Sequence, residues 1–283
     1  NENLLLILFI LFSLSILSSC GTRTPYYGKN YRDWPTLNPP DTTHLTHSIF
    51  LIGDAGTLDN NPVLNLMNRQ LKAADSLISN GDTTKTTKNT VIFLGDNIYY
   101  YGLPEEDAPD RDEKEEIINN QMNSLHGFRG NKIFIPGNHD WRASTEGGLE
   151  TVNRQEQYIE VYGDSTIEFL PNLGCPGPYE LHLSENMVIL IIDSEWWLTH
   201  HEKPIGPENG CFVDDRFDFI VQFQDAVQRN ADKNILIVEH HPLFSNSNHG
   251  GRFSLFDNIF PLTLVRDNLY IPLPLIGSLY PLL

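Results

Sequence analysis

The sequence predicts an α/β fold, in which strands and helices alternate along the chain. Short apolar runs of strand length occur at residues 49–52, 91–94, 132–135 and 235–238. Segments with apolar residues at helical spacing lie between them, and a turn that carries Asp, Asn or His follows each run. Because an α/β sheet presents its chemistry at the carboxyl ends of its strands, these four turns are expected to form one metal site.

The composition is that of a folded globular protein. Of the 283 residues, 40% are hydrophobic and 20% are charged, which allows one large domain or two small ones. The formal net charge is −18. This charge argues against a nucleic-acid partner, and against an anionic membrane surface bound by general electrostatics.

The first part of the chain indicates export. Residues 4–17 form a nearly unbroken apolar run, which is short for a bilayer span and typical of a signal-peptide core. The run ends in LSSC at residues 17–20, which resembles a bacterial lipobox whose cysteine, Cys20, is lipidated. The alternative is an ordinary secretory signal with an incidental cysteine. We therefore expect a lipoprotein signal peptide over residues 1–20, with its start missing, and a lipid-anchored protein of the bacterial cell envelope.

A tether is predicted to connect this anchor to the folded domain. Residues 21–46 are rich in Pro, Tyr, Thr and Asn and show neither a helical nor a strand period. The domain is expected to occupy residues 47–283. Within it, Cys175 and Cys211 could pair in an oxidising compartment, although nothing in the sequence places them close together.

The helices of this domain follow from apolar periodicity. Helices are predicted over residues 62–78, 110–125, 149–161 and 214–228. A hairpin belonging to a second sheet is predicted within residues 179–192. The apolar stripes are Val63, Leu66, Met67, Leu71, Ala74 and Ile78 in the first helix, and Phe217, Ile220, Val221 and Val227 in the last.

The turns after the first two strands carry candidate metal ligands. Asp54 lies between glycines in GDAG at residues 53–56, where the backbone can turn tightly and approach a metal. Asp96 and Tyr99 belong to GDNIY at residues 95–99. A carboxylate can bridge two cations, and a phenolate suits trivalent iron by charge and hardness. Taken singly, the first motif is also a common turn, and the tyrosine is also a packed aromatic.

The turns after the other two strands add different chemistry. In GNHD at residues 137–140, Asn138 offers a neutral oxygen ligand, and His139 offers a proton donor that a nearby carboxylate would orient. His240, the first residue of a His-His-Pro sequence, offers an imidazole ligand. A surface histidine pair is the alternative for this last motif.

Together, Asp, Asp, Asn and His in this order resemble the calcineurin-like metallophosphoesterase superfamily, and in detail its purple acid phosphatase branch. The resemblance covers about residues 49–251 and implies two face-to-face β-sheets with helices outside. Asp140 stands where the family often has Glu. The matching blocks are residues 53–56, 95–99, 137–140 and 240–250, the last containing His249.

The resemblance implies a dinuclear site. Asp54, Asp96 and Tyr99 would hold the first metal, with iron implied there. Asp96 would bridge to a second metal, zinc, manganese or iron, which Asn138 and His240 would also hold. The implied catalytic residues are His139, which would protonate the leaving group, His249, which would bind the phosphoryl oxygens, and Asp140.

The implied activity is hydrolysis of a phosphate ester, preferably a monoester, by a metal-bound hydroxide. Alternatives are a phosphodiesterase or nucleotidase of the same fold, or a surface lipoprotein that binds without turnover. The family closes its site with Gly-His-x-His, whereas this chain has no histidine after His249. We therefore expect a C-terminally truncated domain, with the closing histidines downstream. Phosphate-binding loops, dinucleotide fingerprints, nucleophile elbows and Cys-x-x-Cys pairs do not occur in the sequence.

Overall fold

The computed structural model describes residues 47–79, 89–243, 256, 259–264 and 269–272. Contacts divide the chain into two compact units, and the larger one spans Asp41–His241. The predicted signal peptide and tether, and with them Cys20, lie outside the described residues, as does His249.

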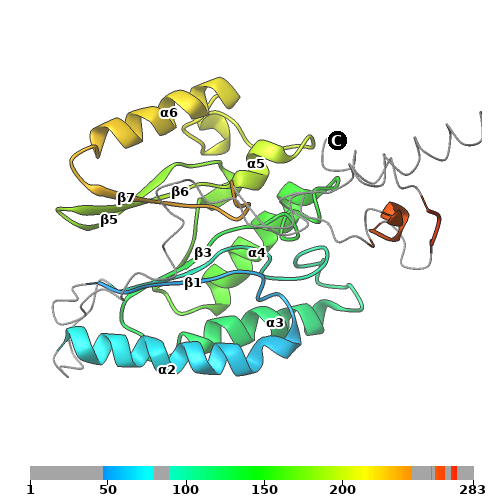
Figure 1. Ribbon diagram of the computed structural model, residues 1–283, viewed down its shortest axis with the longest axis horizontal. Coiled ribbons are helices and arrows are strands. Elements are labelled where there is room, and N and C mark those ends of the chain that lie inside the picture. Colours follow the sequence, from blue (N-terminus) through cyan, green and yellow to red (C-terminus); the bar gives the residue numbers. More distant parts are fainter. Residues whose placement is uncertain (1–46, 80–88, 244–255, 257–258, 265–268, 273–283) are drawn as a thin grey trace, which may run out of the picture. The chain divides into compact units, whose positions relative to one another are not determined.

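The first β-sheet of the larger unit is parallel throughout (Figure 1). Its strands are β1 (Ile49–Ile52), β2 (Thr90–Phe93), β3 (Asn131–Phe134) and β4 (Ile167–Phe169), hydrogen-bonded in that order. A helical crossover joins each pair of consecutive strands, as parallel pairing requires. The strands therefore all end at the same edge of the sheet.

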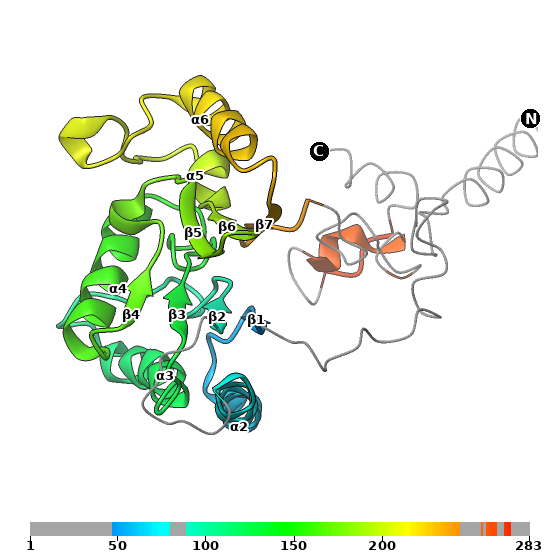
Figure 2. The same cartoon turned by 90° about the vertical axis from the view of Figure 1, so that its left-hand side faces the viewer.

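The second sheet lies face to face with the first (Figure 2). It consists of β5 (Tyr179–Ser184), β6 (Met187–Ile191) and β7 (Asn234–Val238). Strands β5 and β6 pair antiparallel, which confirms the predicted hairpin, and β7 pairs parallel with β6. The strand that precedes His240 thus belongs to a different sheet from the strands that precede the other candidate ligands.

Helices cover the outer faces of both sheets (Figure 2). Helices α2 (Asn61–Ile78), α3 (Arg111–Ser124) and α4 (Gly148–Tyr162) cover the first sheet, and α6 (Arg216–Arg229) covers the second. A short helix, α5 (Ser194–Leu198), follows β6 almost immediately. The predicted class, an α/β sandwich of two sheets flanked by helices, is confirmed. Short 3-10 helices occupy Leu58–Asn60, Asn172–Gly174, Pro207–Asn209 and Pro261–Leu264.

The central strands are apolar on both faces because both faces are covered. In β2, Ile92 contributes to the layer between the sheets, while Val91 and Phe93 pack in the helical layer. In β6, Val188 and Leu190 pack toward α6. Burial of one such side chain contributes about 1.5–3 kcal/mol, so these layers hold the two sheets and their strand ends together.

The buried side of α2 differs from the predicted stripe. Val63 and Leu66 are 53% and 49% exposed. The core-facing side includes Asp75, which is buried and accepts a hydrogen bond from the Asn89 amide over 3.0 Å. Apolar periodicity cannot find a stripe that contains a buried carboxylate. The buried apolar residues of this side are Leu64, Met67 and Leu71.

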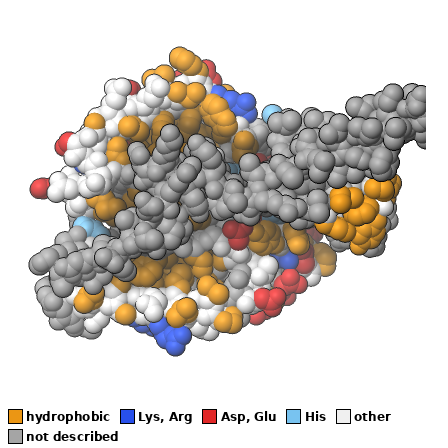
Figure 3. All heavy atoms as spheres, viewed as in Figure 1, with side chains coloured by type: hydrophobic (Ala, Val, Ile, Leu, Met, Phe, Trp, Pro, Cys, Tyr) orange, Lys and Arg blue, Asp and Glu red, His pale blue; other side chains and the backbone are white. Residues whose placement is uncertain are grey.

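In α6 the predicted stripe is wrong for three of its four residues. Phe217, Ile220 and Val221 are 74%, 41% and 37% exposed. Figure 3 shows hydrophobic side chains on the surface at the top of the view, where α6 covers the second sheet. Apolar residues occur on more than one side of this helix, so its periodicity fits two orientations. The residues that pack inward are Phe219, Phe223, Ala226 and Val227.

Cys175 and Cys211 form a disulfide, with 5.5 Å between their Cα atoms. Cys175 lies just before β5, and Cys211 lies between α5 and α6. Both side chains are buried. The disulfide therefore ties the segment after α5 to the start of the second sheet, and it settles a pairing that the sequence left open.

In the smaller unit, Phe256, Phe260 and Tyr270 form one aromatic cluster, with ring centroids 5.1, 6.0 and 6.1 Å apart. Among the helices of the described residues, none combines the length and the apolar character needed to cross a bilayer.

The disulfide is expected to contribute to stability by restricting the unfolded chain, since it closes a loop between cysteines 36 positions apart. Replacing both cysteines, Cys175→Ser with Cys211→Ser, should lower the free energy of unfolding by about 2–4 kcal/mol in urea denaturation. Dithiothreitol should lower the stability of the wild type and leave the double variant unchanged. Equal stability of the two proteins, with and without reductant, would contradict this assignment.

Candidate metal centre

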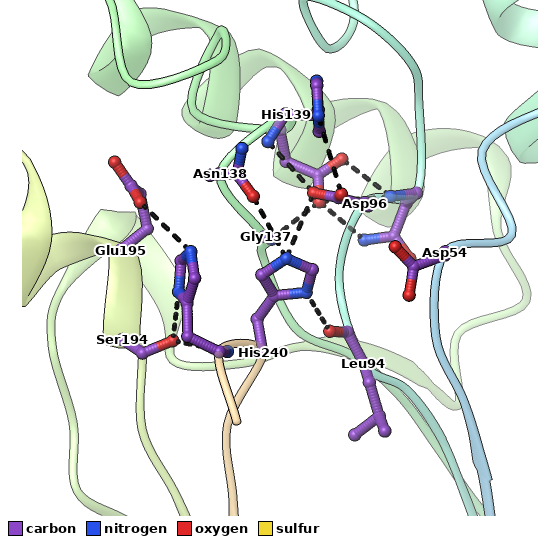
Figure 4. A network of polar contacts seen from close by, with 12 residues as sticks. Asp54, Leu94, Asp96, Gly137, Asn138, His139, Ser194, Glu195 and His240 are labelled. Carbon is purple, nitrogen blue, oxygen red and sulfur yellow. Dashed lines mark hydrogen bonds and ion pairs between the residues drawn. The ribbon is translucent and has the colours of Figure 1, made fainter. Parts of the chain in front are cut away.

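The loops that follow β1, β2, β3 and β7 meet at one end of the sandwich. Figure 4 shows Asp54, Asp96, Asn138, His139 and His240 directed toward one another from these loops. The structure thus brings together residues from four separate parts of the chain, as the strand-end pattern predicts. The ligand roles assigned to them stay predictions.

The backbone of these loops adopts strained conformations, and atoms of neighbouring loops pack directly against its glycines. Asp54 and Asp96 have φ values of 58° and 54°, a left-handed conformation that is uncommon for non-glycine residues and clusters at functional sites. A Cβ at Gly56 would lie 2.6 Å from the Asp96 carbonyl oxygen. A Cβ at Gly137 would lie 2.5 Å from Asp96 Oδ1 and 2.8 Å from His240 Cε1. Only glycine lets these loops come so close.

The imidazole of His240 is held in one tautomer. Its Nδ1 lies 2.7 Å from the Leu94 carbonyl oxygen. A carbonyl can only accept, so Nδ1 is protonated, and in the neutral form of the ring Nε2 presents a lone pair. Nε2 lies 3.2 Å from Asn138 Oδ1 and 3.4 Å from Asp96 Oδ1 (Figure 4). With the ring neutral, three acceptor atoms face one another.

A cation at their centre would satisfy all three acceptors. Ligand atoms about 2.1 Å from a common ion lie roughly 3.0–3.4 Å apart, which matches the separations around His240 Nε2. Among the described residues, His, Cys, Asp and Glu side chains alone do not form a group of three that could hold an ion. The fit depends on the amide oxygen of Asn138, which completes the set.

Tyr99 and Asp54 form a second contact beside this group. The Tyr99 hydroxyl donates a hydrogen bond of 2.7 Å to Asp54 Oδ1. Burial, followed by the hydrogen bond to Asp54 and the charge of Asp96, raises the pKa of Tyr99 above its usual value. A phenolate here therefore requires a compensating cation, which the predicted first metal would provide.

His139 is oriented by a carbonyl group, where the sequence predicted a carboxylate. Its Nδ1 lies 2.7 Å from the Tyr100 carbonyl oxygen, so Nδ1 is the donor. Its Nε2 lies 3.8 Å from Asp96 Oδ2, and the side chain is 21% exposed. The carboxylate next to this ring is thus Asp96, and Nε2 is the nitrogen available to a substrate.

Asp140 is fully buried and faces the backbone. Its carboxylate accepts hydrogen bonds from the N–H groups of Gly137, Asn97 and Ile98, at 2.8, 3.0 and 3.2 Å. Burial and the charge of Asp96 raise the pKa of Asp140 to about 6, although the hydrogen bonds from the backbone lower it. The carboxylate joins the loops after β2 and β3, so its contacts favour a positioning role, and its predicted catalytic role stays a prediction.

Asp193, Ser194 and Glu195, which belong to none of the four sequence motifs, also border this site. Asp193 caps α5 by accepting from the backbone N–H groups of Glu195 and Trp196. Ser194 and Glu195 both contact the ring of His241. The signal that could have found them is that β6, like β1 and β2, is an apolar run with Asp shortly after it.

The chain belongs to the calcineurin-like phosphoesterase family, whose model matches residues 47–266. This family implies metal-dependent hydrolysis of phosphoesters. Neither the curated proteins nor the solved structures give a significant match to the chain.

The buried carboxylate of Asp140 generates a stability prediction. Asp140→Ala leaves the N–H groups of Gly137, Asn97 and Ile98 without an acceptor, so the free energy of unfolding should fall by roughly 2–4 kcal/mol. Urea denaturation of the metal-free protein measures this change. Asp232→Ala, at an exposed position, should leave stability unchanged. An Asp140→Ala protein as stable as this control would contradict the positioning role.

Proposed function

We propose that this protein hydrolyses phosphate monoesters at a centre of two metal ions. The observation that carries the proposal is the acceptor cluster around His240 Nε2, which lies 3.2 Å from Asn138 Oδ1 and 3.4 Å from Asp96 Oδ1. Neutral and anionic lone pairs converge there in a member of a phosphoesterase family, and a cation is the group that such a cluster binds.

The chain's own residues divide between the two ions. Asp54 and Tyr99 would hold the first, Asn138 and His240 the second, and Asp96, which contacts residues of both sets, would bridge them. When bound, the ions supply Lewis acidity toward the phosphoryl oxygens and a lowered pKa for water. Iron in the first site is proposed from the hard phenolate oxygen of Tyr99.

His139 is proposed as the general acid. The Tyr100 carbonyl accepts from Nδ1 at 2.7 Å, so in the imidazolium form of His139 the second proton lies on Nε2, which would donate it to the leaving-group oxygen. The partial exposure of the ring gives a substrate access to this nitrogen. His249 is proposed to bind the phosphoryl oxygens, on the family resemblance alone.

The general-acid role predicts a dependence on the leaving group. His139→Ala should lower kcat about 10²–10⁴-fold for an alkyl phosphate. The loss should be much smaller for p-nitrophenyl phosphate, whose leaving group needs little protonation, and metal content should stay at the wild-type value. His126→Ala, which removes an exposed histidine, is the matched control and should have no effect. Equal losses for both esters would exclude His139 as the acid.

The same assay distinguishes the candidate substrate classes. The proposal expects faster turnover of p-nitrophenyl phosphate than of bis-p-nitrophenyl phosphate, and the opposite order supports a phosphodiesterase. A protein that binds two metal ions and turns over neither ester would support the non-catalytic binding protein.

The assignment of iron predicts a colour. A phenolate bound to trivalent iron absorbs visible light by charge transfer, so the iron-loaded protein should be coloured, and Tyr99→Phe should remove the band while leaving iron bound. Tyr101→Phe, at an exposed neighbouring tyrosine, serves as the control. A colourless, active wild type that contains no iron would refute the assignment.

We also propose that Cys20 carries a lipid anchor at the bacterial cell envelope, on the sequence of residues 4–20. The wild type should incorporate labelled palmitate and partition into the detergent phase, and Cys20→Ser should do neither. Identical partitioning of the two proteins would support the ordinary secretory signal.

A further inference from the structure

Glu195 is an unusual residue because its carboxylate is buried and only partly satisfied. The side chain is 1% exposed, and Oε1 has no hydrogen-bond partner among the described residues. It is the only carboxylate oxygen among the buried unpartnered side-chain atoms of that part of the chain. Leaving such a group without a partner destabilises a fold, so its presence beside the candidate metal centre points to a role in function.

On one side, α5 holds the neighbour of His240. Glu195 Oε2 lies 3.7 Å from His241 Nε2. Ser194 Oγ lies 2.9 Å from His241 Nδ1, and it accepts from the His241 backbone N–H at 3.1 Å. The His241 ring in turn stands edge-on to the His240 ring, with 4.8 Å between their centroids. Figure 4 shows Ser194 and Glu195 on the α5 side of His240.

On the other side, α5 contacts the loop that carries Asn138. Ser144 lies near enough to the Glu195 carboxylate to lower its pKa, which burial raises, and its backbone N–H donates to the Asn138 carbonyl at 3.3 Å. Asp193 accepts a hydrogen bond of 2.8 Å from the Trp141 indole. The turn between these contacts is strained, since Arg142, Ala143 and Ser144 have φ values of 56°, 53° and 57°.

We propose that Glu195 is a positioning residue for the second metal ion. Through His241 and Ser144 it sets the separation between the two atoms that face this ion, His240 Nε2 and Asn138 Oδ1. The inference rests on the proposed function, because it requires an ion between Asp96, Asn138 and His240.

The charge of Glu195 should disfavour folding of the metal-free protein and favour binding of the second ion. In the metal-free protein, burial, with a smaller contribution from the charge of Asp96, raises the pKa of the Glu195 carboxyl above its usual value, so its charged form is unfavourable to folding. A bound divalent ion reverses the sign of the local field. Removing the charge should therefore weaken ion binding without weakening the metal-free fold, which a merely structural residue would not do.

The test is stepwise Zn²⁺ binding to the metal-free protein by isothermal titration calorimetry, combined with urea denaturation of the same samples. Glu195→Gln should weaken the second ion about 10–100-fold, leave the first within about threefold, and leave the metal-free midpoint equal or higher. Ser144→Ala, an exposed substitution, should weaken the second ion in the same direction by a smaller factor. Glu202→Gln, at an exposed position after α5, is the matched control and should change neither measurement.

Two outcomes would overturn the inference. One is wild-type affinity for both ions in Glu195→Gln. The other is a lower metal-free midpoint with both ions weakened equally, which is the result expected of a structural residue. Failure of the proposed function looks different, because the wild type itself would then bind fewer than two Zn²⁺ ions, and both proposals would fall.

Discussion

His240 Nε2 faces two oxygen atoms because the Leu94 carbonyl binds the proton on the other ring nitrogen. The rest of the structure serves to maintain this arrangement. His240 follows β7 in the second sheet, whereas Asp96 and Asn138 follow β2 and β3 in the first. The apolar layer between the sheets must therefore hold the strand ends in place, so that His240 Nε2 stays 3.2 and 3.4 Å from the two oxygen atoms of the other sheet's loops. Fold stability and ion binding depend on the same packing.

Negative charge is concentrated around this point. Asp96, Asp140, Asp193 and Glu195 are each at most 4% exposed. Burial raises the pKa of Asp140 to about 6 and that of Asp193 to about 7, although both carboxylates accept several N–H groups. Divalent ions would offset this charge, since a bound cation is often the largest local charge in a site. The strained loops and glycine contacts would then be part of a rigid frame that bound ions stabilise.

The sequence was sufficient for the α/β class and for the convergence of the four loops, because both follow from apolar runs that end in polar turns. The sandwich of two sheets was implied by the family resemblance. The sequence was not sufficient for features that tertiary contacts determine, such as the buried side of a helix or the orientation of a side chain. The inward side of α2 contains a buried carboxylate, Asp75, that periodicity excludes. The orientation of Asp140 toward backbone N–H groups depends on a neighbouring loop. The pairing of Cys175 with Cys211 depends on how the segment after α5 folds back. The relation of Glu195 to the site depends on the tertiary contact between α5 and His241.

The most direct test of the central claim is anomalous diffraction at the zinc edge from crystals of the protein grown with Zn²⁺. The account predicts a peak about 2.1 Å from His240 Nε2, with Asn138 Oδ1 and one Asp96 oxygen as the other protein ligands and with Nδ1 still bonded to the Leu94 carbonyl. The contrary result is the absence of a peak there, with Nε2 donating a hydrogen bond to Asn138 or Asp96. The histidine would then be an imidazolium in a polar network, and the metal centre would be refuted.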